Sequence, residues 1–155
     1  MTLGNPTELP SFVLLQLGNR RFALPSENVA ELAPPVRLHA FPHRTPMVAG
    51  VIVRRGRIIP VYDVAPVLIG REAPTKRFYL VTIRRFGNKQ EPCAIGVTGE
   101  CELRNAELWP PQLGQPPYVA GVLALDEGTV EVLDLDALVG AGPVPAAAAE
   151  AEVQR

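Results

Sequence analysis

The sequence is poor in the residues that usually carry enzymatic chemistry. It holds only two serines, two cysteines and two histidines among 155 residues, and aromatic residues make up 6% of the chain. Neither serine lies in a Gly-x-Ser-x-Gly elbow, so a serine hydrolase is not expected. The glycines are dispersed and never open a helix with Lys-Ser/Thr, which excludes a phosphate-binding loop. These absences predict a protein that is not an enzyme.

Metal sites and disulfides are also not expected. Two cysteines, Cys93 and Cys101, are too few for a disulfide framework, and a reduced, cytoplasmic setting is the default. His39 and His43 are four positions apart, but Pro42 between them prevents a helical metal-binding pair. The four side chains together lack the spacing of zinc-finger ligands. We therefore expect no metal and no cofactor, and we interpret Cys93 as an inert buried residue in a strand.

Long apolar runs are missing as well. None approaches the ~18 residues of a membrane span, and no basic segment precedes an apolar stretch at the N-terminus, so neither membrane insertion nor a signal peptide is expected. Hydrophobic residues still make up 47% of the chain, which allows a packed core. Seventeen prolines and thirteen glycines favour short strands joined by turns. Residues 1–10 predict a flexible lead-in, and residues 141–155 a disordered Ala/Pro tail.

The net charge of −1 conceals an uneven distribution. Residues 1–78 hold ten Lys/Arg and five Asp/Glu, a balance of +5, whereas residues 79–155 hold five Lys/Arg and eleven Asp/Glu, a balance of −6. A basic half joined to an acidic half can steer contacts with partners of similar build. Chance variation on two solvated surfaces explains the same numbers equally well. The overall charge argues against a nucleic-acid-binding protein.

The chain between its two ends reads as a series of strand pairs. Ser26 predicts the cap of a helical turn over 27–32, and alternation predicts a half-buried strand over 36–40. Asp63 and Asp134 each precede a short amphipathic segment that ends at a glycine, and both are expected to cap it. The predicted strands, joined pairwise by turns, are 12–17 with 21–25, 48–53 with 58–62, 78–86 with 92–98, and 118–125 with 129–133.

The two halves of the chain are related by an internal repeat. A shift of 71 positions places V-A-G-V at 48–51 on V-A-G-V at 119–122, and Asp63 on Asp134. Each copy would supply about five strands, the usual size of a small barrel. We therefore predict an all-β fold of two pseudo-repeated, five-stranded, SH3-like or barrel-like subdomains with short helical turns. A groove between two such barrels is a natural binding place.

The turn Arg54-Arg55-Gly56-Arg57 is the most informative local feature. A solvated hairpin tip is one interpretation. A partner-docking surface is another, because arginine is favoured at interfaces. A barrel-type module that binds nucleic acid or another ligand is the third, although the turn lacks the aromatic side chains on which bases stack.

Residues 48–64, V-A-G-V-I-V-R-R-G-R-I-I-P-V-Y-D-V, resemble the motif of the CheW-like coupling domain of bacterial chemosensory systems. The opening strands, with residues 22–25 and 29–32, resemble the start of the same family. The resemblance covers about residues 11–140, and it implies two intertwined barrel subdomains within that range.

The resemblance also implies a function. Members of this family are adaptors that link the cytoplasmic tip of chemoreceptors to the regulatory domain of a CheA-type histidine kinase, at receptor arrays in the cytoplasm. Chemotaxis and pilus motility are both outputs of such arrays. Arg55 matches the family arginine that is associated with receptor contact. The family usually has Asn-Leu before its Arg-Gly, whereas Val53 and Arg54 stand there in this chain, so the receptor partner stays open. The predicted partner-binding residues are Arg55, Arg54, Arg57, Gly56, Gly50, Val51, Val36 and Arg37.

Overall fold

The computed structural model describes residues 9–40, 47–72 and 78–141. The predicted tail from residue 142 onward, most of the lead-in (1–8) and His43 lie outside these ranges. In chain order the elements are β1 (Ser11–Leu17), β2 (Arg20–Pro25), a 3₁₀ turn η1 (Ser26–Asn28), β3 (Val29–Ala33), β4 (Val48–Arg54), β5 (Arg57–Tyr62), α1 (Ala65–Ile69), β6 (Phe78–Phe86), β7 (Lys89–Val97), β8 (Glu102–Asn105), β9 (Leu108–Trp109), β10 (Val119–Leu125), β11 (Gly128–Leu133) and α2 (Leu135–Ala141). Two predictions about the fold are confirmed by these elements: the mostly-β fold class, and the pairs of strands joined by turns. No helix in these ranges is long and apolar enough to cross a membrane.

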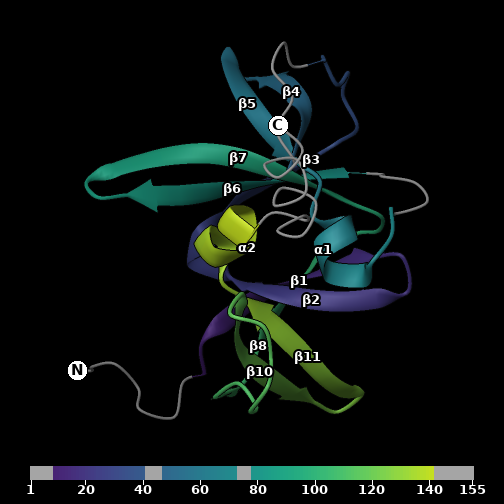
Figure 1. Cartoon of the computed structure of the whole chain (residues 1–155), viewed down its shortest axis with the longest axis vertical. Helices are drawn as coiled ribbons and strands as arrows, with labels where there is room; N and C mark the ends of the chain where they lie inside the picture. Colours follow the sequence, from purple (N-terminus) through teal and green to yellow (C-terminus); the bar gives the residue numbers. More distant parts are fainter. Residues whose placement is uncertain (1–8, 41–46, 73–77, 142–155) are drawn as a thin grey trace, which may run out of the picture.

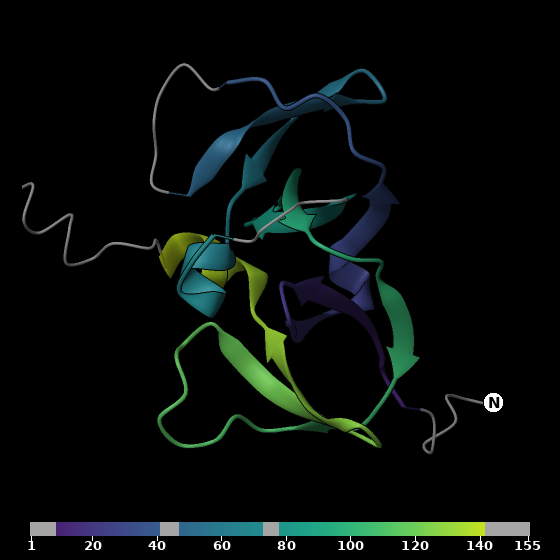
Figure 2. The ribbon, with the colours of Figure 1, turned by 90° about the vertical axis from the view of Figure 1, so that its right-hand side faces the viewer.

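Each of the two sheets combines strands from both copies of the repeat. One sheet has the order β8-β1-β2-β11-β10-β9, and the other has the order β3-β6-β7-β5-β4. The hairpin β1–β2 therefore joins strands of the second copy, and the hairpin β6–β7 joins strands of the first. Figures 1 and 2 show the result as two units at opposite ends of the long axis, with α1 and α2 between them. We call the unit with β4 and β5 the first barrel and the unit with β10 and β11 the second barrel.

The exchange of strands follows the same register in both barrels. Val132 of β11 lies opposite Ala23 of β2 in a parallel pair. Val61 of β5 lies opposite Ala94 of β7. At the shift of 71, Val61 corresponds to Val132 and Ala23 corresponds to Ala94, so the two pairs are equivalent. The bulge at Val48/Gly50 likewise has its counterpart at Val119/Gly121. The repeat seen in the sequence is therefore a repeat of strand pairing.

Three cores hold the fold together. Successive residues of β1 point to opposite faces of the sheet, and both faces are buried, which explains the nearly continuous apolar run. Phe12 and Leu14 point into the second barrel, whereas Leu15 and Leu17 point into the layer between the barrels. The interior of the first barrel holds Ala33, Ile52, Ile59, Val61, Tyr79, Val81 and Ala94. The layer between the barrels also holds Phe22, Leu24, Val64, Leu68, Leu80, Ile95, Val97, Leu133, Leu135 and Leu138.

The glycine of each V-A-G-V copy lies beneath a crossing segment. His39 and Val51 exchange backbone hydrogen bonds of 2.8 and 2.9 Å, which brings the chain directly over Gly50. A Cβ atom on Gly50 would lie 2.4 Å from the His39 carbonyl oxygen, and one on Gly121 would lie 2.6 Å from the Trp109 carbonyl oxygen. Only glycine permits so close an approach of two backbones. The signature is therefore a packing requirement that occurs twice.

The predicted caps are confirmed in one copy and wrong in the other. In α2, the Ala137 N–H donates to Asp134 Oδ1 at 3.1 Å, as expected for a capping aspartate. In α1, Val64 occupies the N-cap position and no side chain caps the helix. The residue equivalent to Ala137 is Pro66, which has no N–H to donate. The Asp63 side chain therefore does not cap α1 as Asp134 caps α2.

Two further local predictions are wrong. The helical turn expected over 27–32 is only the 3₁₀ turn Ser26–Asn28, with Pro25 rather than Ser26 at its N-cap position. Val29–Ala33 is β3 instead, because pairing with β6 buries this segment against strands far away in the sequence. The strand expected over 36–40 is reduced to the single bridge of His39 with Val51. Two prolines, Pro34 and Pro35, precede this segment and cannot donate ladder hydrogen bonds.

Candidate partner-binding site

The basic turn is the tip of the β4–β5 hairpin in the first barrel. Arg55 and Gly56 form a two-residue turn in which both have left-handed backbone angles, with φ of 54° and 76°. Such turns match the twist of the strands but favour Asn or Gly at the first position. Arg55 is the one non-glycine residue with positive φ among the described residues, a conformation that costs an arginine roughly 1 kcal/mol. A strained arginine on an exposed tip points to a role other than folding.

Glu31 of β3 holds two of the three tip arginines. Arg54 donates to both carboxylate oxygens, from Nε at 3.3 Å and from Nη2 at 3.2 Å. Arg55 does the same, at 3.4 and 3.3 Å. The Arg54 and Arg55 guanidiniums hold the pKa of the Glu31 carboxyl below its ordinary value, and Glu31 raises the pKa of Arg55. Two bidentate guanidiniums on one carboxylate leave a surplus of positive charge at the tip.

The outer face of this hairpin is apolar. Val53 and Ile58 lie opposite each other, and their exposed fractions are 52% and 71%. The equivalent pair in the second barrel is Ala124 with Thr129. The β4–β5 hairpin therefore presents adjacent apolar surface as well as positive charge, a combination that marks interaction sites.

The other predicted site residues lie at different depths. Gly50 is buried beneath His39 and is not available to a partner. Val51 is half-buried on β4, and Val36 is half-buried against the core of the first barrel. Arg37 is exposed, on the segment that runs along β4 toward the His39 bridge. The structure therefore gathers Arg54, Arg55, Gly56 and Arg57 on one tip, with Arg37 on a neighbouring segment.

The tip of the second barrel carries the opposite charge. Asp126 and Glu127 stand where Arg55 and Gly56 stand in the first copy. Glu127 accepts hydrogen bonds from Arg21 and Arg104, and Glu102 pairs with Arg104 at 2.8 Å. Glu102 is the counterpart of Glu31 at the shift of 71. The two tips therefore share one framework but differ in the sign of the charge that they present.

A second set of exposed apolar side chains lies along the segment from β8 to the loop after β9. Four large apolar side chains are exposed there within eleven residues, and Leu113 is fully exposed. These side chains, which we call the β8–β9 cluster because they lie close together in the sequence, are Leu103, Leu108, Trp109 and Leu113. Of these, tryptophan is a residue type that often dominates the binding energy of protein interfaces.

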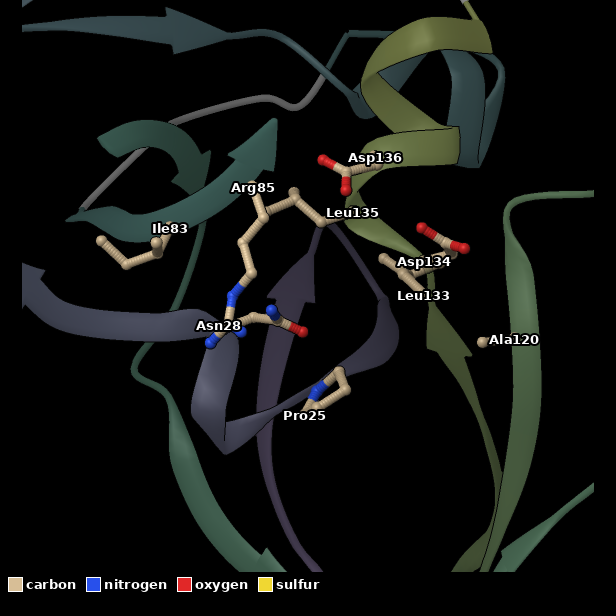
Figure 3. Close-up of a pocket in the computed structure, with 9 residues that line it drawn as sticks. All are labelled: Pro25, Asn28, Ile83, Arg85, Ala120, Leu133, Asp134, Leu135 and Asp136. Carbon is tan, nitrogen blue, oxygen red and sulfur yellow. The ribbon is translucent and has the colours of Figure 1, made fainter. Parts of the chain in front are cut away.

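A hollow of about 270 Å³ opens between the two barrels. It corresponds to the groove predicted from the repeat. Figure 3 shows Arg85 of β6 reaching toward Asn28, with Asp134 and Asp136 across the hollow. Asp136 is engaged by Arg84 at 3.2 Å, and Asp134 caps α2. The residues that line the hollow are Pro25, Asn28, Ile83, Arg85, Ala120, Leu133, Asp134, Leu135 and Asp136.

The structure offers little reactive chemistry in the described ranges. Cys93 is buried, as predicted, and its burial raises the pKa of the thiol. Burial raises the pKa of Cys101 to about 11, so that thiol stays protonated at neutral pH. No group of three or more His, Cys, Asp or Glu side chains among these residues could hold a metal ion.

Sequence reasoning missed Glu31 and the β8–β9 cluster. Glu31 is separated from Arg54 by 23 positions, so no local pattern connects them. A signal was available in the repeat, because Glu31 and Glu102 fall on each other at the same shift as the two V-A-G-V copies. The only tryptophan, Trp109, in a Pro-rich segment was a second available signal.

Comparison with known proteins agrees with this architecture. The CheW-like domain profile matches residues 11–142. A solved structure similar to this chain is that of the scaffolding protein TtCheW from Thermoanaerobacter tengcongensis, with a TM-score of 0.73 and 19% sequence identity. The match covers 89% of this chain and 92% of that one. No individual curated protein matches the sequence.

Proposed function

Because the chain belongs to the CheW-like domain family, we propose that it is a non-enzymatic cytoplasmic adaptor that couples chemoreceptors to a CheA-type histidine kinase in a bacterial chemosensory array. The observation that carries this proposal is the difference between the two barrels. Their strand orders correspond apart from the additional edge strand β9 of the second barrel, yet one barrel exposes a basic tip with an apolar outer face and the other an acidic tip with the β8–β9 cluster. Two unlike surfaces on one chain suit a protein that holds two different partners together.

The basic hairpin is the surface that we assign to the receptor. Arg55 is 74% exposed although it is bonded to Glu31, so its guanidinium is within reach of an acidic group on a partner. Val53 and Ile58 provide apolar surface beside it. Arginine next to exposed apolar side chains is the composition typical of an interface hot spot.

The β8–β9 cluster is the surface that we assign to the regulatory domain of the kinase. It lies in the second barrel, which Figures 1 and 2 show at the end of the long axis opposite the β4–β5 hairpin. One chain can therefore contact both partners at once without overlap. Burial of these apolar side chains, Trp109 among them, against a partner would provide affinity through the hydrophobic effect, which depends little on salt.

The direct test is assembly of a three-component complex. Size-exclusion chromatography of the chain with a chemoreceptor tip fragment and a CheA-type regulatory domain should give co-elution of all three. Co-elution with neither partner, at low and at physiological salt, would rule out the proposed adaptor role. Binding of single-stranded nucleic acid instead would favour the alternative module built on residues 54–57.

Two substitutions should separate the two partners. Arg55→Glu removes the exposed guanidinium and places a second carboxylate beside Glu31, so we expect at least a tenfold loss of receptor-tip affinity with kinase binding unchanged. Leu113→Ser removes a fully exposed apolar side chain, and we expect about a tenfold loss of affinity for the kinase domain, because burial of one leucine side chain against the partner is lost, with receptor binding unchanged.

Isothermal titration calorimetry measures both affinities, and each substitution is the control for the other. Arg71→Glu, at an exposed arginine that follows α1, controls for charge reversal. Equal losses for both partners in either variant would contradict the assignment of separate surfaces.

A further inference from the structure

The two arginines on Glu31 are held in different ways. The Arg54 side chain is 26% exposed and Glu31 is 22% exposed, whereas Arg55 is 74% exposed. Arg54 is the last residue of β4, and Arg55 belongs to the turn. The Arg54–Glu31 pair is therefore shielded and part of the barrel, while the Arg55–Glu31 pair lies in solvent, where ion pairs contribute little.

This difference matters when a partner takes Arg55. A guanidinium that turns to an acidic side chain of a partner leaves behind the carboxylate with which it was paired. A carboxylate that loses its partner and is then covered by an interface is strongly destabilising. In this chain Glu31 would still keep two hydrogen bonds, both from Arg54.

The space around the pair suits an acidic group carried on an apolar segment. A hollow of about 250 Å³ is rimmed by Arg54, Arg55 and Arg57 and floored by Ile59 and Val81, both buried in the first barrel. A carboxylate at the rim and an aliphatic side chain on the floor would each find a complementary surface.

The second barrel lacks this arrangement. The residue equivalent to Arg54 is Leu125, and Glu102, the counterpart of Glu31, is paired with Arg104 of its own strand and with Arg21 of β2. No arginine of that hairpin tip shares the carboxylate. The paired arginines are therefore a feature of the first tip and not of the repeat.

We propose that Arg54 is a positioning residue that keeps Glu31 paired while Arg55 transfers its guanidinium from Glu31 to an acidic side chain of the partner. The proposal rests on the proposed function, because it takes Arg55 as the contact with the receptor. It assigns the partner a chemical character, an Asp or Glu beside an aliphatic residue. It also explains how an arginine already engaged in an ion pair can serve as a docking residue.

The first test needs no partner. Nuclear magnetic resonance of the side-chain carboxyl carbons measures the pKa of Glu31 in the folded chain. We expect it to stay below the ordinary value in Arg55→Gln, because Arg54 remains, and to return to that value when Arg54→Gln is added. A pKa that already returns to the ordinary value in Arg55→Gln overturns the proposal, whatever the partner.

The second test is a set of affinities for a chemoreceptor tip fragment, measured by calorimetry. Arg54→Gln should weaken binding about tenfold, because Arg55 can then leave Glu31 only by leaving it unpaired. Adding Glu31→Gln to Arg54→Gln should restore binding to within threefold of wild type, because no carboxylate is left to abandon. Arg71→Gln, which removes the same charge at an exposed arginine after α1 and outside the basic tip, should change affinity by less than twofold.

The outcomes distinguish the two proposals. A loss in Arg54→Gln that Glu31→Gln does not rescue means that Arg54 contacts the partner itself, and it overturns the positioning role. Equal effects of Arg54→Gln and Arg71→Gln mean that only net charge matters, and they overturn it as well. Absence of binding by the wild-type chain defeats the proposed function, while the pKa measurement still decides whether Arg54 alone holds Glu31.

Discussion

Gly50→Ala is expected to lower the free energy of unfolding by about 3 kcal/mol, a fall in Tm of roughly 10 °C for a domain of this size. The new Cβ would lie 2.4 Å from the His39 carbonyl oxygen, a backbone atom that cannot turn aside like the end of a side chain. The crossing segment must lift, and the two hydrogen bonds between His39 and Val51 weaken with it. Thermal unfolding followed by circular dichroism measures the change.

The second V-A-G-V copy allows the same substitution to be tested twice, and a glycine in α2 serves as the control. Gly121→Ala should be similarly destabilising, because its Cβ would lie 2.6 Å from the Trp109 carbonyl oxygen. Gly140→Ala in α2 meets no atom within 4 Å, and it should leave Tm unchanged or raise it slightly, since alanine favours a helix. A Tm for Gly50→Ala within 2 °C of wild type would show that the V-A-G-V glycine is not required for packing.

Separating the chain between α1 and β6 should abolish folding of both halves. Fragment 1–72 would keep β1 and β2 without β8 and β11, and β3 to β5 without β6 and β7. Phe22 and Leu24, both fully buried in the intact chain, would lose much of their cover. Neither fragment can complete a barrel, so we expect each alone to give the circular dichroism spectrum of an unfolded chain.

Mixing the two fragments should restore the fold. All strand pairs of the intact chain are available in the mixture, so an equimolar mixture should recover the β-sheet spectrum and a cooperative thermal transition. Its Tm should rise with concentration, because folding is now also association. A cooperative transition in either fragment alone would contradict the reciprocal exchange of strands.

Local patterns predicted much of the fold. The turns expected between the paired segments placed the hairpins well, because a turn is specified by the residues within it. The same reasoning was wrong at 27–32, where pairing of β3 with β6 decided the outcome. A pairing between segments some fifty residues apart leaves no local period to detect.

The charges of the candidate site were predicted from the sequence, but the ion pairs that its arginines form were not. Residues 54–57 showed an arginine-rich turn, and the structure does place it on an exposed tip. What the sequence could not show is that Glu31 neutralises part of that charge, since ion pairs across a barrel depend on strand order. The difference between Arg54 and Arg55, one shielded and one in solvent, follows from the position at which β4 ends.

The exchange of strands between the two copies also determines the order in which the molecule can be made. β2 leaves the ribosome more than a hundred residues before β11, its parallel partner. Until β11 has been made, the β1–β2 hairpin therefore leaves Phe22 and Leu24 incompletely buried. Contacts between residues so far apart in the chain slow folding, and they prolong the lifetime of aggregation-prone intermediates with exposed apolar side chains. The two halves of the chain therefore have to assemble with each other before the molecule can present either exposed surface.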